Sequence, residues 1–351
     1  MKKRLFNIIL IFTISIGFIA YHFRTVDTAS VWEGLKNAHI GWLFGGMFAM
    51  FLYWLLEAFI LHRISRKVTI HSTIGEAFRI TLVGQFFNTI TPLATGGQPA
   101  QLYILTKNGM DAGAASSVLL IKLIVYQGML VVNSLIVLLF GYHYLLNGSL
   151  PKMSVLILMG FTLNTLFIVA LIVVGKNKKI ASLIVHFLLK PVSFFTKTET
   201  YSSLKNNVEQ KMNLFHAESK RISVDLKLLL QCSVLTTLQL WLFFSIPYFV
   251  LQGVGAGPLD LLQIIAFHTF IIMFSSLIPI PGGSGGAELS FSLLFGLILD
   301  PTTLVLSLFL WRFITYYSCI LFGSISLMVK KKEKAQDFGK TTRGVEMNPH
   351  R

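Results

Sequence analysis

The chain has 351 residues, of which 54% are apolar and 13% are charged. Soluble domains carry about 25% charged residues, so this composition excludes a water-soluble globule and indicates an integral membrane protein. Lysine and arginine number 30 against 15 acidic residues, a formal net charge of +15. The positions of these bases distinguish nucleic-acid binding, attraction to an anionic membrane surface and topology signals.

The first apolar run covers residues 5–23, directly after Met1-Lys-Lys-Arg. No small-residue cleavage site follows it, which favours an uncleaved first helix over a signal peptide. Six further runs reach the roughly 20 residues that cross a bilayer core: 41–61, 114–146, 153–174, 228–251, 259–280 and 303–329. Two shorter stretches, 76–105 and 281–299, are interrupted by glycine and proline.

The basic residues divide the connecting segments into two classes. Of the 30 bases, 24 lie in segments 1–4, 62–75, 107–113, 175–227 and 329–351. Segments 24–40 and 147–152 contain only Arg24, Lys36 and Lys152. The positive-inside rule makes the first class cytoplasmic, both termini included, and the second external.

This topology makes the stretches 76–106 and 259–300 return to the side from which they start. We therefore predict an all-α polytopic membrane protein with six spanning helices and two oppositely oriented re-entrant hairpins. The second hairpin has an alternative, because 259–280 alone is long enough to span. Counted by hydropathy, the same chain has seven or eight helices.

The two predicted hairpins share the pattern Pro-x-x-x-Gly-Gly, which begins at Pro92 and again at Pro281, 189 residues later. Irregular backbone inside a membrane is tolerated only where it is buried in protein or lines a water-filled cavity. Inverted repeats with broken helices are typical of transporters, whereas close helix packing through glycine is the simpler alternative. We predict an inverted repeat whose substrate-binding glycines are Gly96, Gly97, Gly285 and Gly286.

Five charged residues lie inside the apolar runs: Glu57, Arg79, Lys122, Glu288 and Arg312. Each costs about 2.5–3.5 kcal/mol near a helix centre on insertion scales. Glu57, Arg79 and Lys122 are close enough to segment ends to extend toward the interface. Glu288 follows the glycine loop and Arg312 is mid-helix, so we expect these two to orient a headgroup. An ammonium would favour the acids and a phosphate the bases; the pairing stays open.

An intramembrane protease is one alternative, because Gly282-Gly-Ser-Gly matches the Gly-x-Ser-Gly of rhomboid proteases. A serine nucleophile needs a base, and in rhomboids the histidine follows the serine. Here only His350, in the basic tail, follows Ser284, while His268 precedes it and is expected to be a helix-packing residue.

No cofactor is expected from the motifs present. The chain lacks the Gly-x-x-x-x-Gly-Lys-Ser/Thr motif of ATP-binding loops and the His-Glu-x-x-His motif of zinc proteases. The sequence therefore gives no sign of ATP-driven transport or of zinc protease activity. The two cysteines, Cys232 and Cys319, lie in apolar stretches and form no disulfide framework or zinc spacing.

The longest polar segment, 175–227, holds ten bases and four acids. Residues 180–195 are predicted to form an interfacial helix with a central Lys190-Pro191. A polar helix is expected over 205–222, with one side formed by Leu204, Val208, Met212 and Phe215. Attraction to anionic lipid explains this charge better than nucleic-acid binding does, and we expect no nucleic-acid partner.

Three stretches resemble the flippase-like membrane family represented by the transmembrane half of lysylphosphatidylglycerol synthase, the bacterial multiple peptide resistance factor. They read Asn88-Thr-Ile-Thr-Pro-Leu-Ala-Thr-Gly-Gly-Gln-Pro-Ala-Gln-Leu, Ala115-Ser-Ser-Val-Leu-Leu-Ile-Lys and Pro279-Ile-Pro-Gly-Gly-Ser-Gly-Gly-Ala-Glu. The resemblance covers residues 5–330, and its most specific motif is Pro-Gly-Gly-x-Gly-x-x-Glu.

The resemblance implies translocation of a lipid with a large polar head, aminoacylated phosphatidylglycerol in the best-known members. Those members add a cytoplasmic synthase domain, for which the 22 residues after position 329 leave no room. Many members also carry an acid and a base in the first motif, where this chain has Gln98 and Gln101. This departure leaves the lipid open.

The sequence thus predicts a flippase of the bacterial plasma membrane, with a transmembrane domain over 1–329, a disordered basic tail over 330–351 and a membrane phospholipid, anionic or aminoacylated, as partner. Two alternatives remain, a phosphatidylglycerol lysyltransferase and a non-transporting membrane scaffold, and an oligomer is compatible with all three.

Overall fold

The structure, a computed structural model, describes residues 28–69, 73–146, 151–183, 198–276 and 278–329. These residues form helices and connecting loops, with no strand among them. The predicted helix at 5–23, most of the predicted interfacial helix at 180–195 and the tail at 330–351 lie outside the described residues.

Five helical segments are long and apolar enough to cross a membrane, and they coincide with five of the six runs that were predicted to span it. They are α3 (Ile40–Ser65), α6 (Ala112–Leu146), α7 (Pro151–Lys176), α10 (Leu226–Gly253) and a continuous segment of α13 (Pro301–Arg312), the π-helical turn η3 (Phe313–Tyr317) and α14 (Ser318–Met328). Helix α7 has 17% of its apolar window buried against 61% for the last segment. The outer face of α7 therefore suits contact with lipid.

Two helices are broken where the sequence carries Pro-x-x-x-Gly-Gly. The first unit consists of α4 (Ile74–Ile90), the 3-10 turn η1 (Pro92–Ala94) and α5 (Gly97–Lys107); the second consists of α11 (Leu261–Ser275), η2 (Pro281–Gly283) and α12 (Gly286–Phe295). We call them hairpin 1 and hairpin 2, and η1 and η2 their tips.

The apolar run 259–280 is long enough in sequence to span a membrane, but it does not form one long helix. Helix α11 ends at Ser275 after 15 residues, about 22 Å of helix against a hydrocarbon core of about 30 Å. Pro279 and Pro281 follow, and proline disfavours helical backbone in the residue before it. The helix therefore stops short of spanning length.

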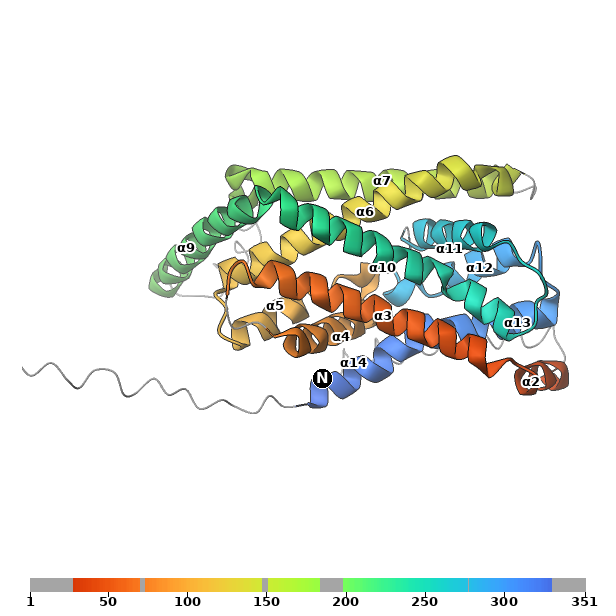
Figure 1. Cartoon of the computed structure of the whole chain (residues 1–351). Coiled ribbons are helices and arrows are strands. Elements are labelled where there is room, and N and C mark those ends of the chain that lie inside the picture. Colours follow the sequence, from red (N-terminus) through yellow and green to blue (C-terminus); the bar gives the residue numbers. More distant parts are fainter. Residues whose placement is uncertain (1–27, 70–72, 147–150, 184–197, 277, 330–351) are drawn as a thin grey trace, which may run out of the picture.

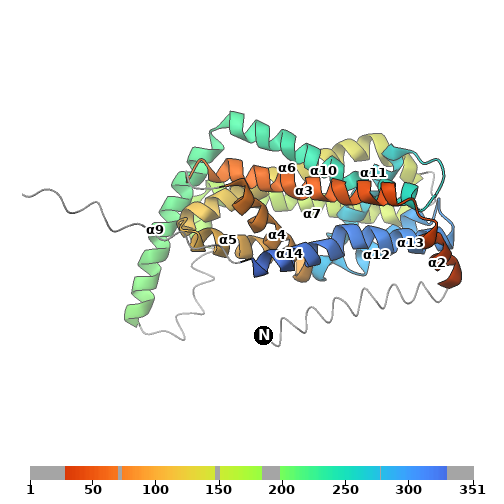
Figure 2. The same ribbon diagram turned by 60° about the horizontal axis from the view of Figure 1, so that its bottom comes forward.

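Helices α3 and α10 pack along each other, α4 lies against α14, and α11 contacts both α6 and α7. The two tips touch one another in the middle of the bundle (Figures 1 and 2). Behind hairpin 2 the core is aromatic: the Phe291 ring stacks on Trp311 at 4.8 Å and on Phe295 at 4.3 Å.

The described basic-rich segments gather at one end of the bundle, where α9 (Thr198–Ser223) lies across it (Figure 2). Ion pairs join the loops at this end, Lys67 to Asp225 at 2.6 Å and Lys211 to Asp111 at 2.9 Å. The predicted polar helix over 205–222 is confirmed by α9, and Met212 on its apolar side is buried.

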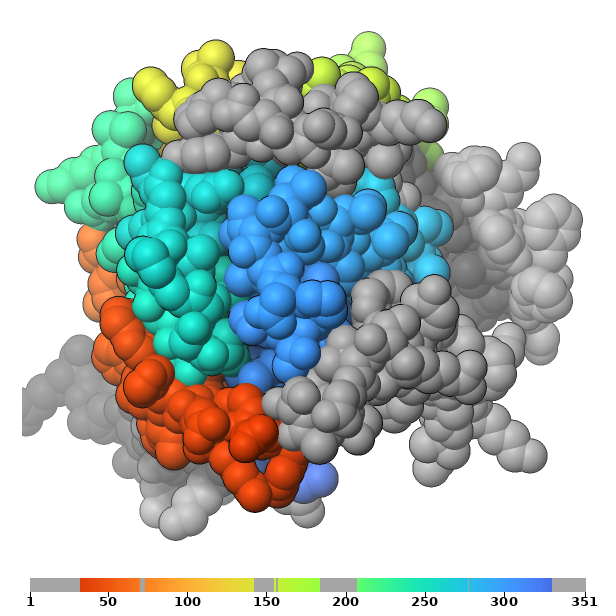
Figure 3. All heavy atoms as spheres, turned by 90° about the vertical axis from the view of Figure 1, so that its right-hand side faces the viewer, coloured from red at the N-terminus to blue at the C-terminus, as the bar shows by residue number. Residues whose placement is uncertain are grey.

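The opposite end carries the segments with few bases. Helix α2 (Thr28–Lys36) packs against α13, and the His39 N–H donates to Gly253 O at 2.7 Å. In Figure 3 the α10–α11 and α12–α13 connections lie side by side, with α2 along their edge.

Candidate functional site

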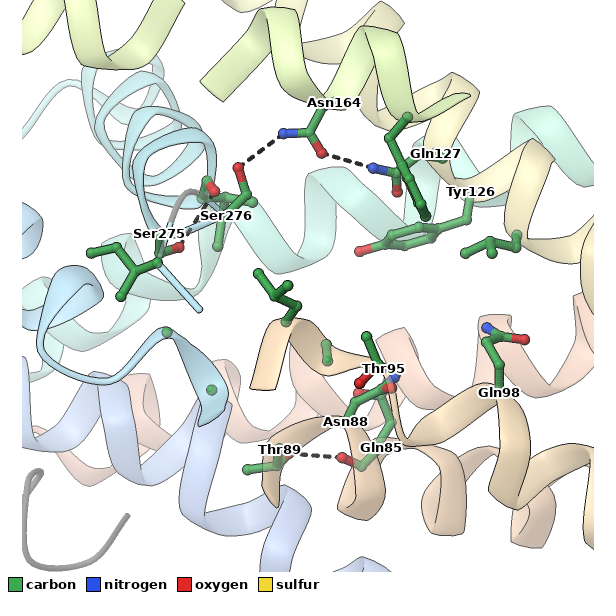
Figure 4. A pocket seen from close by; sticks show the side chains of 18 of the residues that line it. Gln85, Asn88, Thr89, Thr95, Gln98, Tyr126, Gln127, Asn164, Ser275 and Ser276 are labelled. Atoms are coloured by element: carbon green, nitrogen blue, oxygen red, sulfur yellow. Dashed lines mark hydrogen bonds between the residues drawn. The ribbon is translucent and has the colours of Figure 1, made fainter. Parts of the chain in front are cut away.

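A partly open cavity of about 610 Å³ lies where the two hairpin tips meet, between α3, α4, α6, α7 and α11 (Figure 4). Of its 23 described lining residues, two are charged, Glu57 and Lys122. Twelve are uncharged and polar: Tyr53, Gln85, Asn88, Thr89, Thr95, Gln98, Tyr126, Gln127, Asn164, Ser275, Ser276 and Tyr316. The cavity thus gathers polar side chains within an otherwise apolar bundle, interleaved with apolar ones such as Leu123, Phe167 and Ile272.

Both tips have the same backbone conformation. Each begins with proline, and the two residues that follow have positive φ: Leu93 and Ala94 at 52°, Gly282 at 61° and Gly283 at 62°. Glycine is required at 282 for a second reason, because a Cβ there would lie 2.0 Å from Cε2 of Tyr316.

The predicted glycines of hairpin 1 bring its two limbs together. The Gly96 N–H donates to Thr91 Oγ1 at 2.8 Å, and the Gly97 N–H donates to Asn88 Oδ1 at 2.9 Å. A Cβ on Gly97 would come within 2.2 Å of that Asn88 oxygen. These two amides therefore already have acceptors on the hairpin itself.

In hairpin 2 the same start of a helix is capped by an acid. The Gly285 N–H donates to Glu288 Oε2 at 2.6 Å, with Gly285 at φ 85°. Gly286 allows the limbs to approach closely, since a Cβ would lie 1.9 Å from Cδ1 of Ile278.

Glu57 and Lys122 form a buried ion pair at the cavity wall. Lys122 Nζ lies 2.6 Å from Glu57 Oε1 and donates to Gln101 Oε1 at 3.1 Å, while Gln85 Nε2 donates to Glu57 Oε2 at 2.5 Å. Glu57 is 7% exposed and Lys122 6%, so neither side chain extends to the interface. The network joins α3, α4, α5 and α6.

Glu288 and Arg312 form a second buried pair, with 2.9 Å between Glu288 Oε2 and Arg312 Nη2. Neither is among the described residues that line the cavity. The Arg312 guanidinium lies 5.3 Å from the ring of Tyr316, which does line it. The geometry thus places this pair behind tip 2 and one side chain away from the cavity.

The remaining predicted residues divide between the cavity and the periphery. Arg79 lies away from the cavity, where its Nε donates to Ser326 O at 3.1 Å and ties α4 to α14. Gln98 lines the cavity, and its buried Oε1 has no hydrogen-bond donor among the described residues. Gln101 is 2% exposed and acts through Lys122.

The prediction that His268 is a packing residue is confirmed. It is fully buried, its Nδ1 lies 3.2 Å from Phe244 O, and its ring packs against Phe243 at 4.9 Å and Trp311 at 5.5 Å.

The sequence did not predict the uncharged polar side chains that α6 and α7 contribute to the cavity, because only charged residues were candidates within the long apolar runs. Gln127 Nε2 donates to Asn164 Oδ1 at 2.7 Å, and Asn164 Nδ2 donates to Ser276 Oγ at 3.0 Å. This chain of hydrogen bonds links α6, α7 and α11 across the cavity from tip 1 (Figure 4). The carboxamide side chains of Gln127 and Asn164, within the apolar runs 114–146 and 153–174, were the sequence feature that could have predicted this part of the cavity wall.

Comparisons with known proteins agree with this architecture. The family described as the lysylphosphatidylglycerol synthase TM region matches residues 8–323. A UPF0104 membrane protein of Archaeoglobus fulgidus is 26% identical over 326 residues, which cover 91% of this chain and 96% of that protein. An uncharacterized protein of Mycoplasma genitalium, MG306, is 24% identical over 364 residues, covering 96% and 91% of the two chains.

Proposed function

Because the chain belongs to the lysylphosphatidylglycerol synthase TM region family, we propose that it carries a polar-headed lipid between the two leaflets of a membrane. The observation that carries the proposal is the polar cavity at the meeting point of the hairpin tips. Its volume of about 610 Å³ lies within the roughly 300–1,000 Å³ of small-molecule sites. A lipid headgroup is of that size.

The lengths of the hairpin limbs support re-entrant insertion. Helices α4, α5, α11 and α12 have 17, 11, 15 and 10 residues, about 25, 16, 22 and 15 Å at 1.5 Å per residue. Each is shorter than a hydrocarbon core of about 30 Å. Irregular backbone at this depth is tolerated where it is buried in protein or lines a water-filled cavity, and residues of both tips line the cavity.

The element order supports an inverted repeat. A long helix, a broken hairpin and another long helical segment follow one another as α3 to α6 and again as α10 to the continuous segment of α13, η3 and α14. Transporters with such repeats place their substrate near the midplane, between the halves, and rock one half against the other. In our proposal this movement exposes the cavity to each leaflet in turn, while the acyl chains stay in lipid.

The predicted site residues take distinct parts in this proposal. Glu57, Lys122 and Gln98 contact the headgroup from the cavity wall, and Gln101 supports Lys122. Gly96, Gly97, Gly285 and Gly286 let the limbs of each hairpin close. Glu288 and Arg312 hold tip 2 in position, and Arg79 anchors α4.

The membrane in this proposal is the bacterial plasma membrane. The lysine and arginine residues of the described basic-rich end favour the cytoplasmic side, and in our proposal both termini lie on that side. The partner is a membrane phospholipid, anionic or aminoacylated.

The test uses purified protein in liposomes that contain a phospholipid labelled on its acyl chain with a dye that external dithionite reduces. Loss of the inner-leaflet signal measures transfer between leaflets. We expect wild-type protein to speed this loss over protein-free liposomes. The absence of any acceleration, for every lipid tried, would overturn the proposal and favour a scaffold; formation of a new lipid from lysyl-tRNA and phosphatidylglycerol would favour the lysyltransferase.

A matched pair of variants ties transfer to the cavity. Thr95 lines the cavity and bonds to Pro92 O at 2.9 Å, whereas Thr162 is an exposed residue of α7 outside the lining, bonded to Leu158 O at 2.8 Å. Thr95→Trp should slow transfer about tenfold, a barrier increase of about 1.4 kcal/mol, because the indole occupies headgroup space. Thr162→Trp should leave the rate unchanged.

A further inference from the structure

The charges on the described cavity wall cancel. Glu57 and Lys122 are the charged residues among the described lining, and they are bonded to each other at 2.6 Å. Each also has a neutral partner, Gln85 for the carboxylate and Gln101 for the ammonium. A buried pair loses its compensation when one partner is taken away. The wall therefore offers no spare carboxylate to a cationic headgroup.

The rest of the polar wall is made of carboxamides and hydroxyls. These groups both donate and accept hydrogen bonds, as a polyol does. The chain from Gln127 through Asn164 to Ser276 presents them on one side, and Gln98 faces it from the other (Figure 4). The buried Gln98 Oε1 has no donor in the described part of the chain, so it is an acceptor to which a ligand hydroxyl would donate.

Aromatic rings add an apolar surface to this wall. Tyr53, Tyr126, Phe167 and Tyr316 line the cavity, and a tyrosine ring combines an apolar face with a polar hydroxyl. The C–H faces of a sugar or a glycerol pack on such rings while their hydroxyls reach the amides.

We propose that the cavity selects a hydroxyl-rich headgroup without a cationic group, glycerol or a sugar, over a lysyl headgroup. The proposal rests on the transport function proposed above and names its substrate class. Two kinds of lipid carry this chemistry, phosphatidylglycerol and a glycosyl diacylglycerol. They differ in the phosphate, for which Lys122 is the nearest cation on the described wall.

The test compares four acyl-labelled lipids in the liposome assay: phosphatidylglycerol, glucosyl diacylglycerol, phosphatidylethanolamine and lysylphosphatidylglycerol. We expect one or both of the first two to move at least about five times faster than lysylphosphatidylglycerol, about 1 kcal/mol in barrier. Transfer of the glucosyl lipid would show that the phosphate is dispensable. Transfer of phosphatidylglycerol without transfer of the glucosyl lipid would show that the phosphate is required. Equal rates for all four, or a preference for the ammonium-bearing lipids, would overturn this inference and leave the transport function standing. No transfer of any lipid would instead overturn the transport function.

Introducing a negative charge at Gln98 tests the headgroup preference of the cavity. Its readout is a ratio of two transfer rates, which misfolding alone does not raise. Gln98→Glu adds an unpaired carboxylate to the wall and should raise the ratio of lysylphosphatidylglycerol to phosphatidylglycerol rates about tenfold, the equivalent of 1.4 kcal/mol. The control Gln252→Glu adds the same charge at the end of α10, where Gln252 bonds to Gly257 O at 3.4 Å outside the lining. An unchanged ratio in folded Gln98→Glu protein would contradict the proposal.

The amide wall is tested by Asn164→Leu. Its control is Asn133→Leu, another buried asparagine, bonded to Trp241 Nε1 at 2.8 Å and absent from the lining. Asn164→Leu should abolish the preference for hydroxylated lipids, and Asn133→Leu should retain it. Loss of the preference in both variants would show that it does not come from the cavity.

Discussion

The two hairpin tips have nearly the same backbone and opposite surroundings. At the tip of hairpin 2 the positive-φ residues are Gly282 and Gly283, packed against Tyr316 and Ser275. In hairpin 1 they are Leu93 and Ala94, both exposed, with Leu93 57% exposed. The comparison teaches that the same turn after proline forms with or without glycine, whereas packing decides which residues can occupy it.

The buried charges differ in the same way. Glu288 caps tip 2 directly through Gly285 and pairs with Arg312 outside the described cavity lining. The Glu57–Lys122 pair instead bridges helices around hairpin 1 and forms part of the cavity wall. The ion pair next to tip 2 thus lies outside the described cavity lining, whereas the ion pair beside hairpin 1 belongs to it.

Breaking the ion pair behind tip 2 should have the largest effect. Arg312→Met leaves Glu288, which is 1% exposed, as an uncompensated buried charge, at a cost of about 3–5 kcal/mol. Lys122→Met should cost less, because Glu57 lines the cavity and water can reach it. The midpoint of denaturation in detergent measures both variants. A larger loss for Lys122→Met would reverse the comparison.

A side chain at Gly282 should have the next largest effect. Gly282→Ala should lower the free energy of unfolding for two reasons. Alanine at a positive φ costs about 1–3 kcal/mol, and the clash of its Cβ with Tyr316 costs about another 1–3 kcal/mol through overpacking. Its control is Gly285→Ala, where φ is also positive but an added Cβ meets no atom within 4 Å. This variant should lose only the stability that the positive φ costs. Thermal unfolding measures both variants. Equal losses of stability would show that the contact with Tyr316 does not require glycine at position 282.

Relief of the strained tip 1 should give a smaller change of opposite sign. Leu93→Gly removes a left-handed backbone cost of about 1–2 kcal/mol, offset by about 0.5–1 kcal/mol from the entropy of glycine. We expect a stabilisation of about 0.5–1 kcal/mol, measured by the same unfolding midpoint. Leu93→Ala retains the Cβ and should give no gain; a gain there would assign the effect to the exposed leucine.

The smallest effect is expected far from the tips, at the basic-rich end. Hydrogen bonding from Lys211 lowers the pKa of Asp111, and hydrogen bonding from Lys67 lowers that of Asp225. A pKa lowered by folding contributes stability that is present above the unfolded value of about 3.9 and is lost as pH falls through the folded value. The difference in melting temperature between pH 7 and acid pH should therefore be smaller in Asp111→Asn than in wild type. Equal differences would show that this exposed pair contributes nothing.

The sequence alone determined the class of the protein, five of its membrane-length helices and the positions of both helix breaks. These properties are local: an apolar run of about 20 residues needs no partner to be recognised, and proline and glycine interrupt a helix wherever they stand. The family could also be named from the motifs around Pro92 and Pro281, and residues 8–323 match it.

Only the tertiary structure decided which charges meet and where the cavity lies. Glu57 and Lys122 are 65 residues apart and come together because α3 and α6 are neighbours. Gln127 and Ser276 meet through Asn164 in the same way. A pairing between helices depends on their order in space and their rotation, which hydrophobic periodicity cannot provide for helices apolar on nearly every side. The uncharged wall of the cavity therefore stayed hidden until the helices were in place.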